Sequence, residues 1–370
     1  MRCHCLLPHL RVGFPCSLTY VSGFLTCVSG SFFAHLRFEL VEAGRILLQS
    51  GMKIDWPSPE TANLIAFELF NRAIQFSEEL DIQVEKINEA TVLDFAVERQ
   101  GKLQSGILLS QICMGGMAMI DWLPQGKSNS GRVEVRTEKP LRSCMGSQYA
   151  GWPISEGDFF AMCSGPMRML RGKEDVLTEY GLVGDGVNAV GVMEANALPT
   201  EEVISQIAAE CRVDPRDVCL CVARTASYPG AFQVVARGLE TAIHKLHELK
   251  FDLGVIVDGK SNVPIPPIPD DDLVALGWTN DCVLYGGKVE LTVDTTDQAI
   301  EVVIEQVPSC SSSEFGTPFL EIFNRFDQDF YKIDKMLFSP AEVTITNQQT
   351  GNVFQAGHVR EDVLKSSFGV

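Results

Sequence analysis

Hydrophobic residues recur along the chain with two periods, so both strands and helices are expected. Short apolar or alternating runs are typical of strands, whereas apolar residues three and four positions apart are typical of helices. The pattern predicts strands at 82–87, 91–97, 132–136, 158–163, 188–194, 217–223, 282–285 and 289–293. It predicts helices at 105–114, 200–210, 228–252, 270–276 and 295–306, and a hairpin from 343–346 and 353–355.

The alternation of these elements indicates an α/β fold with mixed sheets. Helices that alternate with strands cover the faces of a sheet, while hairpins add antiparallel pairs to it. A chain of 370 residues has room for about two domains or for one large domain with two lobes. We expect layered α/β lobes, and the sequence leaves the boundary between them open.

The segment 228–252 has the most informative pattern, because it predicts a long amphipathic helix with a polar stripe. Its apolar face carries Val235, Leu239, Ala242, Leu246 and Leu249, and its polar face carries Arg237, Glu240, His244 and His247. Side chains three residues apart on one helix face touch each other. A guanidinium keeps a neighbouring carboxylate ionised unless burial opposes it. Arg237 and Glu240 are therefore the candidate catalytic pair, and an ordinary solvated ion pair is the alternative.

The same polar face raises the possibility of a metal site. Glu240, His244 and His247 could ligate zinc from one helix, as in a metal-dependent amidohydrolase. Zinc hydrolases usually take ligands from more than one element, and His358 is the only other histidine after Met52. We therefore expect no metal, and keep the amidohydrolase as an alternative.

Several loops combine polar, aromatic and glycine residues in an unusual way. They lie at 147–153, 162–168, 279–281 and 309–313, and the last is rich in the donors that bind anions. Together they suggest a cleft for a flat polar heterocycle with an anionic tail. The candidate substrate-binding residues are Ser147, Gln148, Tyr149, Arg168, Thr279, Asn280, Asp281 and Ser311.

Charge and cysteine content narrow the class of protein. The net charge is −18, whereas sequence-independent binding to nucleic acid needs clustered Lys and Arg on its phosphates. No nucleic-acid partner is therefore expected. The cysteines after Met52 are scattered and form no C-x-x-C pair, which is typical of a reduced, cytoplasmic protein.

The first 51 residues differ from the rest of the chain. No charged side chain occurs from Val12 to Leu36, a length that could span a bilayer or form a signal peptide. Polar residues interrupt this run, however, and Met52 opens a segment in which Ser58 and Pro59 could begin a helix. We expect 1–51 to be an extension from a mis-assigned start, without a folded role or a membrane partner. A targeting segment is the alternative.

Six strings in the remaining chain resemble one family closely. They are QICMGG at 111–116, SQYAGWPI at 147–154, SGPMR at 164–168, ETAIHKLHELKF at 240–251, TNDCVLYGG at 279–287 and DFYKIDKMLFSP at 329–340. From Met52 to Val370 the chain resembles the methenyltetrahydromethanopterin cyclohydrolases of methanogenic archaea and methylotrophic bacteria.

The resemblance implies two α/β lobes with the substrate pocket between them, assembled as a homotrimer. It implies a reaction without metal or cofactor, in which a tetrahydromethanopterin-type carrier is itself the substrate. It also places Arg237 and Glu240 at the reacting carbon. Water would add to the methenyl carbon between N5 and N10, with Glu240 as base, to give the N5-formyl product. A catalytically idle pterin-binding protein is a further alternative, although the Arg and Glu are both present.

Overall fold

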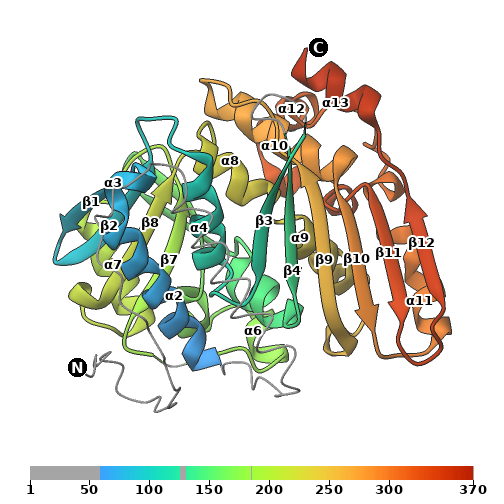
Figure 1. The fold of residues 1–370 in the computed structure, drawn as a ribbon, viewed down its shortest axis with the longest axis horizontal. Helices are drawn as coiled ribbons and strands as arrows, with labels where there is room; N and C mark the ends of the chain where they lie inside the picture. The colour runs from blue at the N-terminus through green and yellow to red at the C-terminus, as the bar shows by residue number, and fades with distance from the viewer. Residues whose placement is uncertain (1–58, 126–130, 185, 370) are drawn as a thin grey trace, which may run out of the picture. The chain divides into compact units, whose positions relative to one another are not determined.

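The computed structural model describes residues 59–125, 131–184 and 186–369, and these form two six-stranded sheets (Figure 1). Sheet A has the order β1 (Gln83–Ile87), β2 (Ala90–Ala96), β8 (Val218–Ala223), β7 (Ala189–Glu194), β6 (Phe159–Ser164), β5 (Trp152–Glu156). Sheet B has the order β12 (Val353–Gly357), β11 (Glu342–Asn347), β10 (Lys288–Val293), β9 (Ile256–Pro264), β4 (Gly131–Thr137), β3 (Met119–Pro124).

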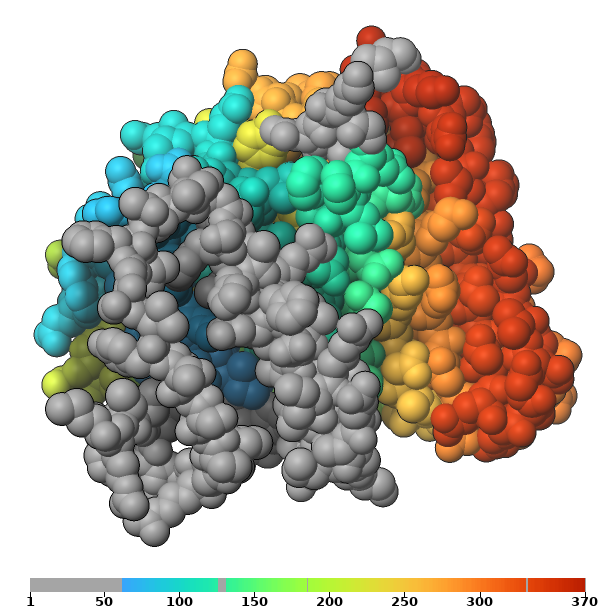
Figure 2. Space-filling view, in the orientation of Figure 1, coloured from blue at the N-terminus to red at the C-terminus, as the bar shows by residue number. Residues whose placement is uncertain are grey.

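Both sheets are mixed, which confirms the predicted α/β class. In sheet A, β8 runs parallel to β2 and to β7, and in sheet B, β10 runs parallel to β11. Sheet B also joins distant parts of the chain, because β4 pairs with β9 antiparallel and places Arg132 opposite Pro264. In the space-filling view, the green segment that contains β3 and β4 adjoins the orange and red C-terminal segments (Figure 2).

The described α-helices fall into an early group, which precedes β8 in the sequence, and a later group, which follows β8. The early ones are α2 (Pro59–Gln75), α3 (Ser77–Leu80), α4 (Leu103–Cys113), α5 (Met167–Arg171), α6 (Asp175–Glu179) and α7 (Glu201–Cys211). The later ones are α8 (Tyr228–Val235), α9 (Gly238–Glu248), α10 (Asp272–Gly286), α11 (Asp297–Val303), α12 (Phe319–Arg325) and α13 (Glu361–Phe368). A π-helix, η1, spans Leu141–Gln148.

The central strands β2, β7 and β8 of sheet A are buried on both faces, as their sequences require. In β2, Leu93 and Phe95 pack with residues of α2 and α4, whereas Val92 packs with residues of α7. Successive side chains of a strand point to opposite faces, so a strand covered by helices on both sides is apolar throughout. This explains why β2 and β8 read as continuous hydrophobic runs.

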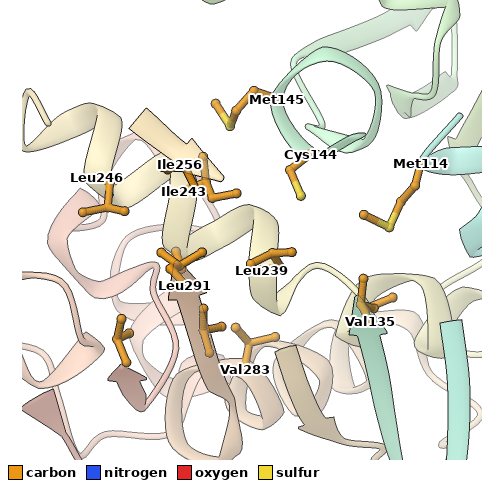
Figure 3. Close-up of a cluster of buried hydrophobic side chains, with 14 of the residues drawn as sticks. Met114, Val135, Cys144, Met145, Leu239, Ile243, Leu246, Ile256, Val283 and Leu291 are labelled. Atoms are coloured by element: carbon orange, nitrogen blue, oxygen red, sulfur yellow. The ribbon is translucent and has the colours of Figure 1, made fainter. Parts of the chain in front are cut away.

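The helix α9 is fixed between sheet B and η1. Leu239, Ile243 and Leu246 repeat at helical spacing and are fully buried. Figure 3 shows them in one cluster with Leu291 of β10 and Met145 of η1. Burying an aliphatic side chain stabilises the fold by about 1.5–3 kcal/mol. This apolar face therefore determines where the opposite, polar face of α9 lies.

Two predicted elements are wrong, and three strands were not predicted. The expected single helix 228–252 is divided into α8 and α9, because the backbone turns at Ala236 and Arg237. The expected strand 282–285 belongs to α10, since a short apolar run does not distinguish a strand from a buried helix. The unpredicted strands are β3, β5 and β9. The hairpin of β11 and β12 is confirmed.

The predicted extension at 1–51 and the predicted cap at Ser58 lie outside the described residues. Within the described part of the chain, no helix is both long and apolar enough to cross a membrane.

Candidate active site

Arg237 lies at the junction of α8 and α9, and is only 9% exposed. One terminal nitrogen, Nη1, donates to the backbone carbonyl of Gln148. The other, Nη2, donates to Ser164 Oγ at 3.1 Å and to Gln233 Oε1 at 3.0 Å, and lies 3.8 Å from Cys113 Sγ. These acceptors come from separate elements, so the position of the guanidinium is set by the whole fold.

The groups around Arg237 are neutral acceptors held by the ends of regular elements. Cys113 ends α4 and Ser164 ends β6, and their Sγ and Oγ atoms are 3.2 Å apart. Burial raises the pKa of the Cys113 thiol, which keeps it protonated at neutral pH. Sequence reasoning did not single out Cys113, Ser164 or Gln233. Only Gln233, four residues before Arg237, had a signal in its spacing.

Glu240 lies in the first turn of α9 and is 5% exposed. Burial raises the pKa of its carboxyl to about 7, while the positive charges of Arg237 and Arg168 pull the pKa downward. The ion pairs among the described residues do not include Arg237 with Glu240, so the contact predicted from their spacing is absent. The reason is the turn between α8 and α9, which directs the guanidinium toward Gln148.

The π-helix η1 brings the predicted site residues Ser147 and Gln148 to this region, and Tyr149 follows as its C-cap. Ser147 Oγ donates to the carbonyl of Cys113 at 2.7 Å. Gln148 is fully buried, and its Nε2 donates to the carbonyl of Ala236 at 3.2 Å. Its Oε1 is buried without a hydrogen-bond partner among the described residues. An unpaired buried acceptor costs about 1–3 kcal/mol, and π-helices are frequent at functional sites.

Arg168 contacts η1 and also contributes positive charge to the site. Nη1 of its fully buried guanidinium donates to the carbonyls of Met145, Gly146 and Ser147 near the end of η1, each at 3.2 Å. It also forms an ion pair with Glu174, with Nε 3.0 Å from Oε1. A cation at a helix C-terminus satisfies carbonyls that lack partners within the helix. Arg168 therefore fixes η1 and also adds positive charge near Glu240.

An aromatic surface lies beside Glu240. The rings of Tyr149 and His244 stack with centroids 5.1 Å apart and an interplanar angle of 17°. His244 is one turn after Glu240 on α9, and burial lowers its pKa. Burial, and then the charge of Glu240, raises the pKa of Tyr149 to about 12. Both rings are thus uncharged at neutral pH, and the guanidinium of Arg168 lies over the Tyr149 ring, with Cζ 5.1 Å from its centroid.

The histidines predicted for the metal alternative make other contacts. His244 stacks on Tyr149, and His247 Nε2 lies 3.1 Å from Glu179 Oε2. Across residues 59–125, 131–184 and 186–369, no group of three or more His, Cys, Asp or Glu side chains is arranged to hold a metal ion. A cavity of about 500 Å³ lies at the C-terminal end of α9 and includes His247, Glu179 and Lys250.

The predicted residues Thr279, Asn280 and Asp281 lie within α10. The side chains of Thr279 and Asn280 donate to carbonyls one turn earlier in the same helix. Asp281 accepts the backbone N–H of Phe319 at 2.8 Å and the hydroxyl of Ser367. Burial raises the pKa of Asp281 to about 7. Their predicted role toward substrate stays a prediction.

Ser311 is exposed and contacts a different face of α9. Its Oγ accepts a hydrogen bond from Lys245 Nζ at 3.1 Å. Lys245 is five residues after Glu240, which places it away from the Glu240 face of the helix. Burial lowers the pKa of Lys245 to about 8. The structure thus gathers Ser147, Gln148, Tyr149, Arg168, Arg237 and Glu240, whereas Ser311 and the α10 residues make contacts elsewhere.

Sequence comparison gives a consistent family for this chain. Residues 61–368 match the cyclohydrolase (MCH) family. The chain is 45% identical over 288 residues to the methenyltetrahydromethanopterin cyclohydrolase of Rhodopirellula baltica, which covers 76% of this chain and 86% of that protein. It is 38% identical over 318 residues to the enzyme of the same name from Methanothermobacter marburgensis, covering 84% and 99%. It is 38% identical over 317 residues to that of Methylobacillus flagellatus, covering 85% and 96%.

Proposed function

The chain belongs to the methenyltetrahydromethanopterin cyclohydrolase family, and we propose that Glu240 is the general base of its reaction. The protein is a hydrolase of tetrahydromethanopterin-dependent one-carbon metabolism. The proposed reaction converts 5,10-methenyl-tetrahydromethanopterin to the 5-formyl compound. The observation that carries the proposal is the position of Glu240, a carboxyl only 5% exposed at the start of α9, whose pKa burial raises to about 7. A general base works best when its pKa lies near the working pH.

The substrate supplies the electrophile, since the methenyl carbon between N5 and N10 belongs to a cationic amidinium. The water oxygen forms a bond to this carbon while Glu240 takes one proton from the water. The protonated Glu240 then gives that proton to N10 as the bond between the carbon and N10 breaks. The remaining hydroxyl loses its proton and becomes the formyl oxygen on N5. One proton is released overall, which balances the lost positive charge.

Arg237 and Arg168 make this base available at neutral pH. Without their charges, burial alone would raise the pKa of Glu240 further and leave the carboxyl protonated. Burial excludes water that would otherwise compete for the carboxylate. General-base assistance of this kind is worth about 10²–10⁴-fold in rate.

The substrate ring is proposed to lie against Tyr149 and His244. The His244 ring is stacked on Tyr149 on one side and is partly exposed, so a pterin ring could stack on its other face. The unpaired Oε1 of Gln148 is oriented by the bond from its own Nε2 to Ala236, so it can accept a hydrogen bond from a substrate N–H group. A hydrogen bond from the substrate to Oε1 would remove the free-energy cost of leaving this buried acceptor unpaired.

The proposal also concerns the oligomeric state of the protein and its need for a metal or cofactor. We expect a homotrimer, without metal or cofactor, whose small-molecule partner is the pterin substrate. Light scattering on the purified protein measures the oligomer. Elemental analysis of the same sample tests the metal-dependent alternative, which requires about one zinc per chain together with loss of activity on chelation.

The decisive assay follows the absorbance of the methenyl carrier with purified protein. Turnover of methenyltetrahydromethanopterin, well above that of methenyltetrahydrofolate as control, supports the proposal. Binding of the carrier without turnover would instead identify an idle pterin-binding protein. Turnover that disappears with chelator would favour the amidohydrolase mechanism.

A further inference from the structure

A chain of polar side chains continues behind Arg237 and ends at a carboxylate that the proposed reaction does not use. Gln233 Oε1 accepts a hydrogen bond from Arg237 Nη2 at 3.0 Å. Gln233 Nε2 in turn donates to Glu194 Oε2 at 3.4 Å. The hydroxyl of Thr225 donates to the other oxygen, Glu194 Oε1. Glu194 is the last residue of β7, and Gln233 is 2% exposed in α8.

The chemistry of the two ends determines the orientation of the amide between them. A guanidinium can only donate hydrogen bonds, and an ionised carboxylate can only accept them. The Gln233 amide must therefore present its oxygen to Arg237 and its NH₂ group to Glu194. If the amide were reversed, donor would face donor and acceptor would face acceptor, and both bonds would be lost.

We propose that Gln233 and Glu194 are positioning residues that hold Arg237 at a fixed place relative to Glu240. This inference rests on the proposed function, because it concerns the pH at which Glu240 can act as the base. Gln233 lies on α8 and Glu240 on α9, and Arg237 occupies the turn between the two helices. The hydrogen bonds from Arg237 through Gln233 to Glu194, called the relay below, connect this turn to the end of β7. A looser Arg237 would stabilise the ionised form of Glu240 less, so the pKa of Glu240 would rise.

Two single substitutions break the relay at different places. Gln233→Leu keeps the side-chain size and removes both hydrogen bonds. Glu194→Leu removes the acceptor of both the Gln233 NH₂ group and the Thr225 hydroxyl. Loss of a hydrogen bond to a charged group has an effect of about 10- to 100-fold. We expect each variant to lower kcat by about 10-fold and to move the ascending limb of the pH profile to higher pH. The change in KM should be smaller.

The exchange variant Glu194→Gln with Gln233→Glu separates positioning from simple support of the fold. The new amide at position 194 can donate to the new carboxylate at position 233, which can accept from Arg237. Donor and acceptor then match again along the relay. Gln233→Glu alone sets two carboxylates against each other and should lower kcat, and we expect most of that loss to return in the exchange variant. The carboxylate now lies beside Arg237 and offsets its charge, so the ascending limb should stay above that of the wild type.

Gln206→Leu is the matched control. Gln206 Nε2 donates to Glu210 Oε1 at 3.0 Å on α7, which is the same kind of bond outside the site. We expect wild-type kcat and pH profile for this control. Thermal melts identify any variant that fails to fold, and Gln233→Asn, which shortens the bridge by one methylene, then replaces Gln233→Leu.

Two outcomes would overturn the relay in an enzyme that is otherwise active. One is an unchanged kcat and pH profile in both single variants. The other is an exchange variant no more active than Gln233→Glu when both are equally folded. Failure of the proposed function looks different, because the wild-type protein would then show no turnover of the methenyl carrier, or Glu240→Gln would retain full activity.

Discussion

Arg237 acts on Glu240 through its charge, since its hydrogen bonds go to Gln148, Ser164 and Gln233. Charges that do not touch still interact strongly in a buried site, where the effective dielectric constant is low. The balance between burial and the two arginines leaves the pKa of Glu240 at about 7. The carboxylate therefore changes charge within the pH range in which the enzyme can be assayed.

Replacing Arg237 with alanine should move the ascending limb of the kcat/KM profile to higher pH and lower the plateau by at least about 10-fold. Without the guanidinium, burial raises the pKa of Glu240 further, so the base form appears only at higher pH. Stopped-flow assays from pH 5 to 9 measure both effects. Arg171→Ala is the control, because Arg171 pairs with Glu210 and does not act on Glu240. An unshifted limb in Arg237→Ala would mean that the two residues are not coupled.

The site could be predicted from sequence only where spacing or family resemblance carries the information. Arg237 and Glu240 share one segment, and Ser147 to Tyr149 lie in one characteristic string. The acceptors Cys113, Ser164 and Gln233 meet only because α4, β6 and α8 end at the same place. No local pattern records such a convergence, and this is why the relay behind Arg237 was not predicted.

The junction of α8 and α9 depends on its close packing against β9. A Cβ atom added at Gly238 would lie 2.5 Å from Val263 Cγ2 and 3.4 Å from Ser261 Cβ. Backbone strain is not the reason for glycine here, because Gly238 begins an ordinary α-helix. The reason is the approach of the helix to the strand.

Gly238→Ala should destabilise the protein and lower kcat. Alanine favours a helix by up to about 1 kcal/mol over glycine, but overpacking of a core costs about 1–3 kcal/mol, so the clash dominates. Adding Val263→Ala removes the clashing methyl and should recover part of the melting temperature, relative to Val263→Ala alone. Thermal melts and kcat measure the outcome. A Gly238→Ala protein as stable as the wild type would show that the helix and strand can separate without cost.

The elements that were predicted well are those whose burial matches a simple period. The strand β2 is buried on both faces, and the apolar face of α9 repeats at three and four residues. The strand β9 was missed because Gly259 and Ser261, not large apolar residues, occupy two of its four buried positions. A Cβ at Gly259 would lie 2.7 Å from Leu239 Cδ1, so small residues are needed where α9 packs. That requirement is visible only once the helix and the sheet are placed together.

At the scale of the whole described molecule, the titration of the buried acids Glu240 and Asp281 links stability to pH. The pKa values of Glu240 and Asp281 are both raised to about 7, from ordinary values of 4.5 and 3.8. Between its ordinary pKa and its raised pKa, each carboxyl keeps its proton in the folded protein but has released it in the unfolded chain. Their contribution to the free energy of unfolding is therefore complete below about pH 4 and is lost as the pH rises toward about 7.

Asp281→Asn should raise the melting temperature at pH 8 by about 2–4 °C for each kcal/mol gained. The amide can still accept from the N–H of Phe319 and can donate to the Ser367 hydroxyl, and it has no charged form to bury. The gain should shrink toward pH 4. The exposed Asp158→Asn is the control, for which no such pH-dependent gain is expected. A variant that is less stable than the wild type at pH 8 would show that the charged carboxylate is the form that supports α10.

A chain that begins at Met52 should fold, assemble and turn over substrate like the full-length protein. The family match covers 61–368, and the contacts of the candidate site come from Cys113 onward. The segment before Met52 includes the largely apolar run from Val12 to Leu36 without a charged side chain, which favours aggregation when it is exposed. Light scattering, sedimentation and kcat compare the two proteins. An insoluble or inactive shortened chain, or full-length protein in a membrane fraction, would give the segment a real role.

The central claim is that the buried Glu240 carboxylate takes the proton from water, and the pH profile of kcat/KM for Glu240→Gln beside the wild type tests it most directly. For the wild type we predict a rise of one power of ten per pH unit that levels off near pH 7, where the carboxyl of the free enzyme ionises. Glu240→Gln cannot ionise, so its profile should lack this rise and lie at least about 10²-fold below the wild-type plateau. A variant that keeps the same ascending limb, or that approaches wild-type turnover, would contradict the assignment of Glu240 as the base.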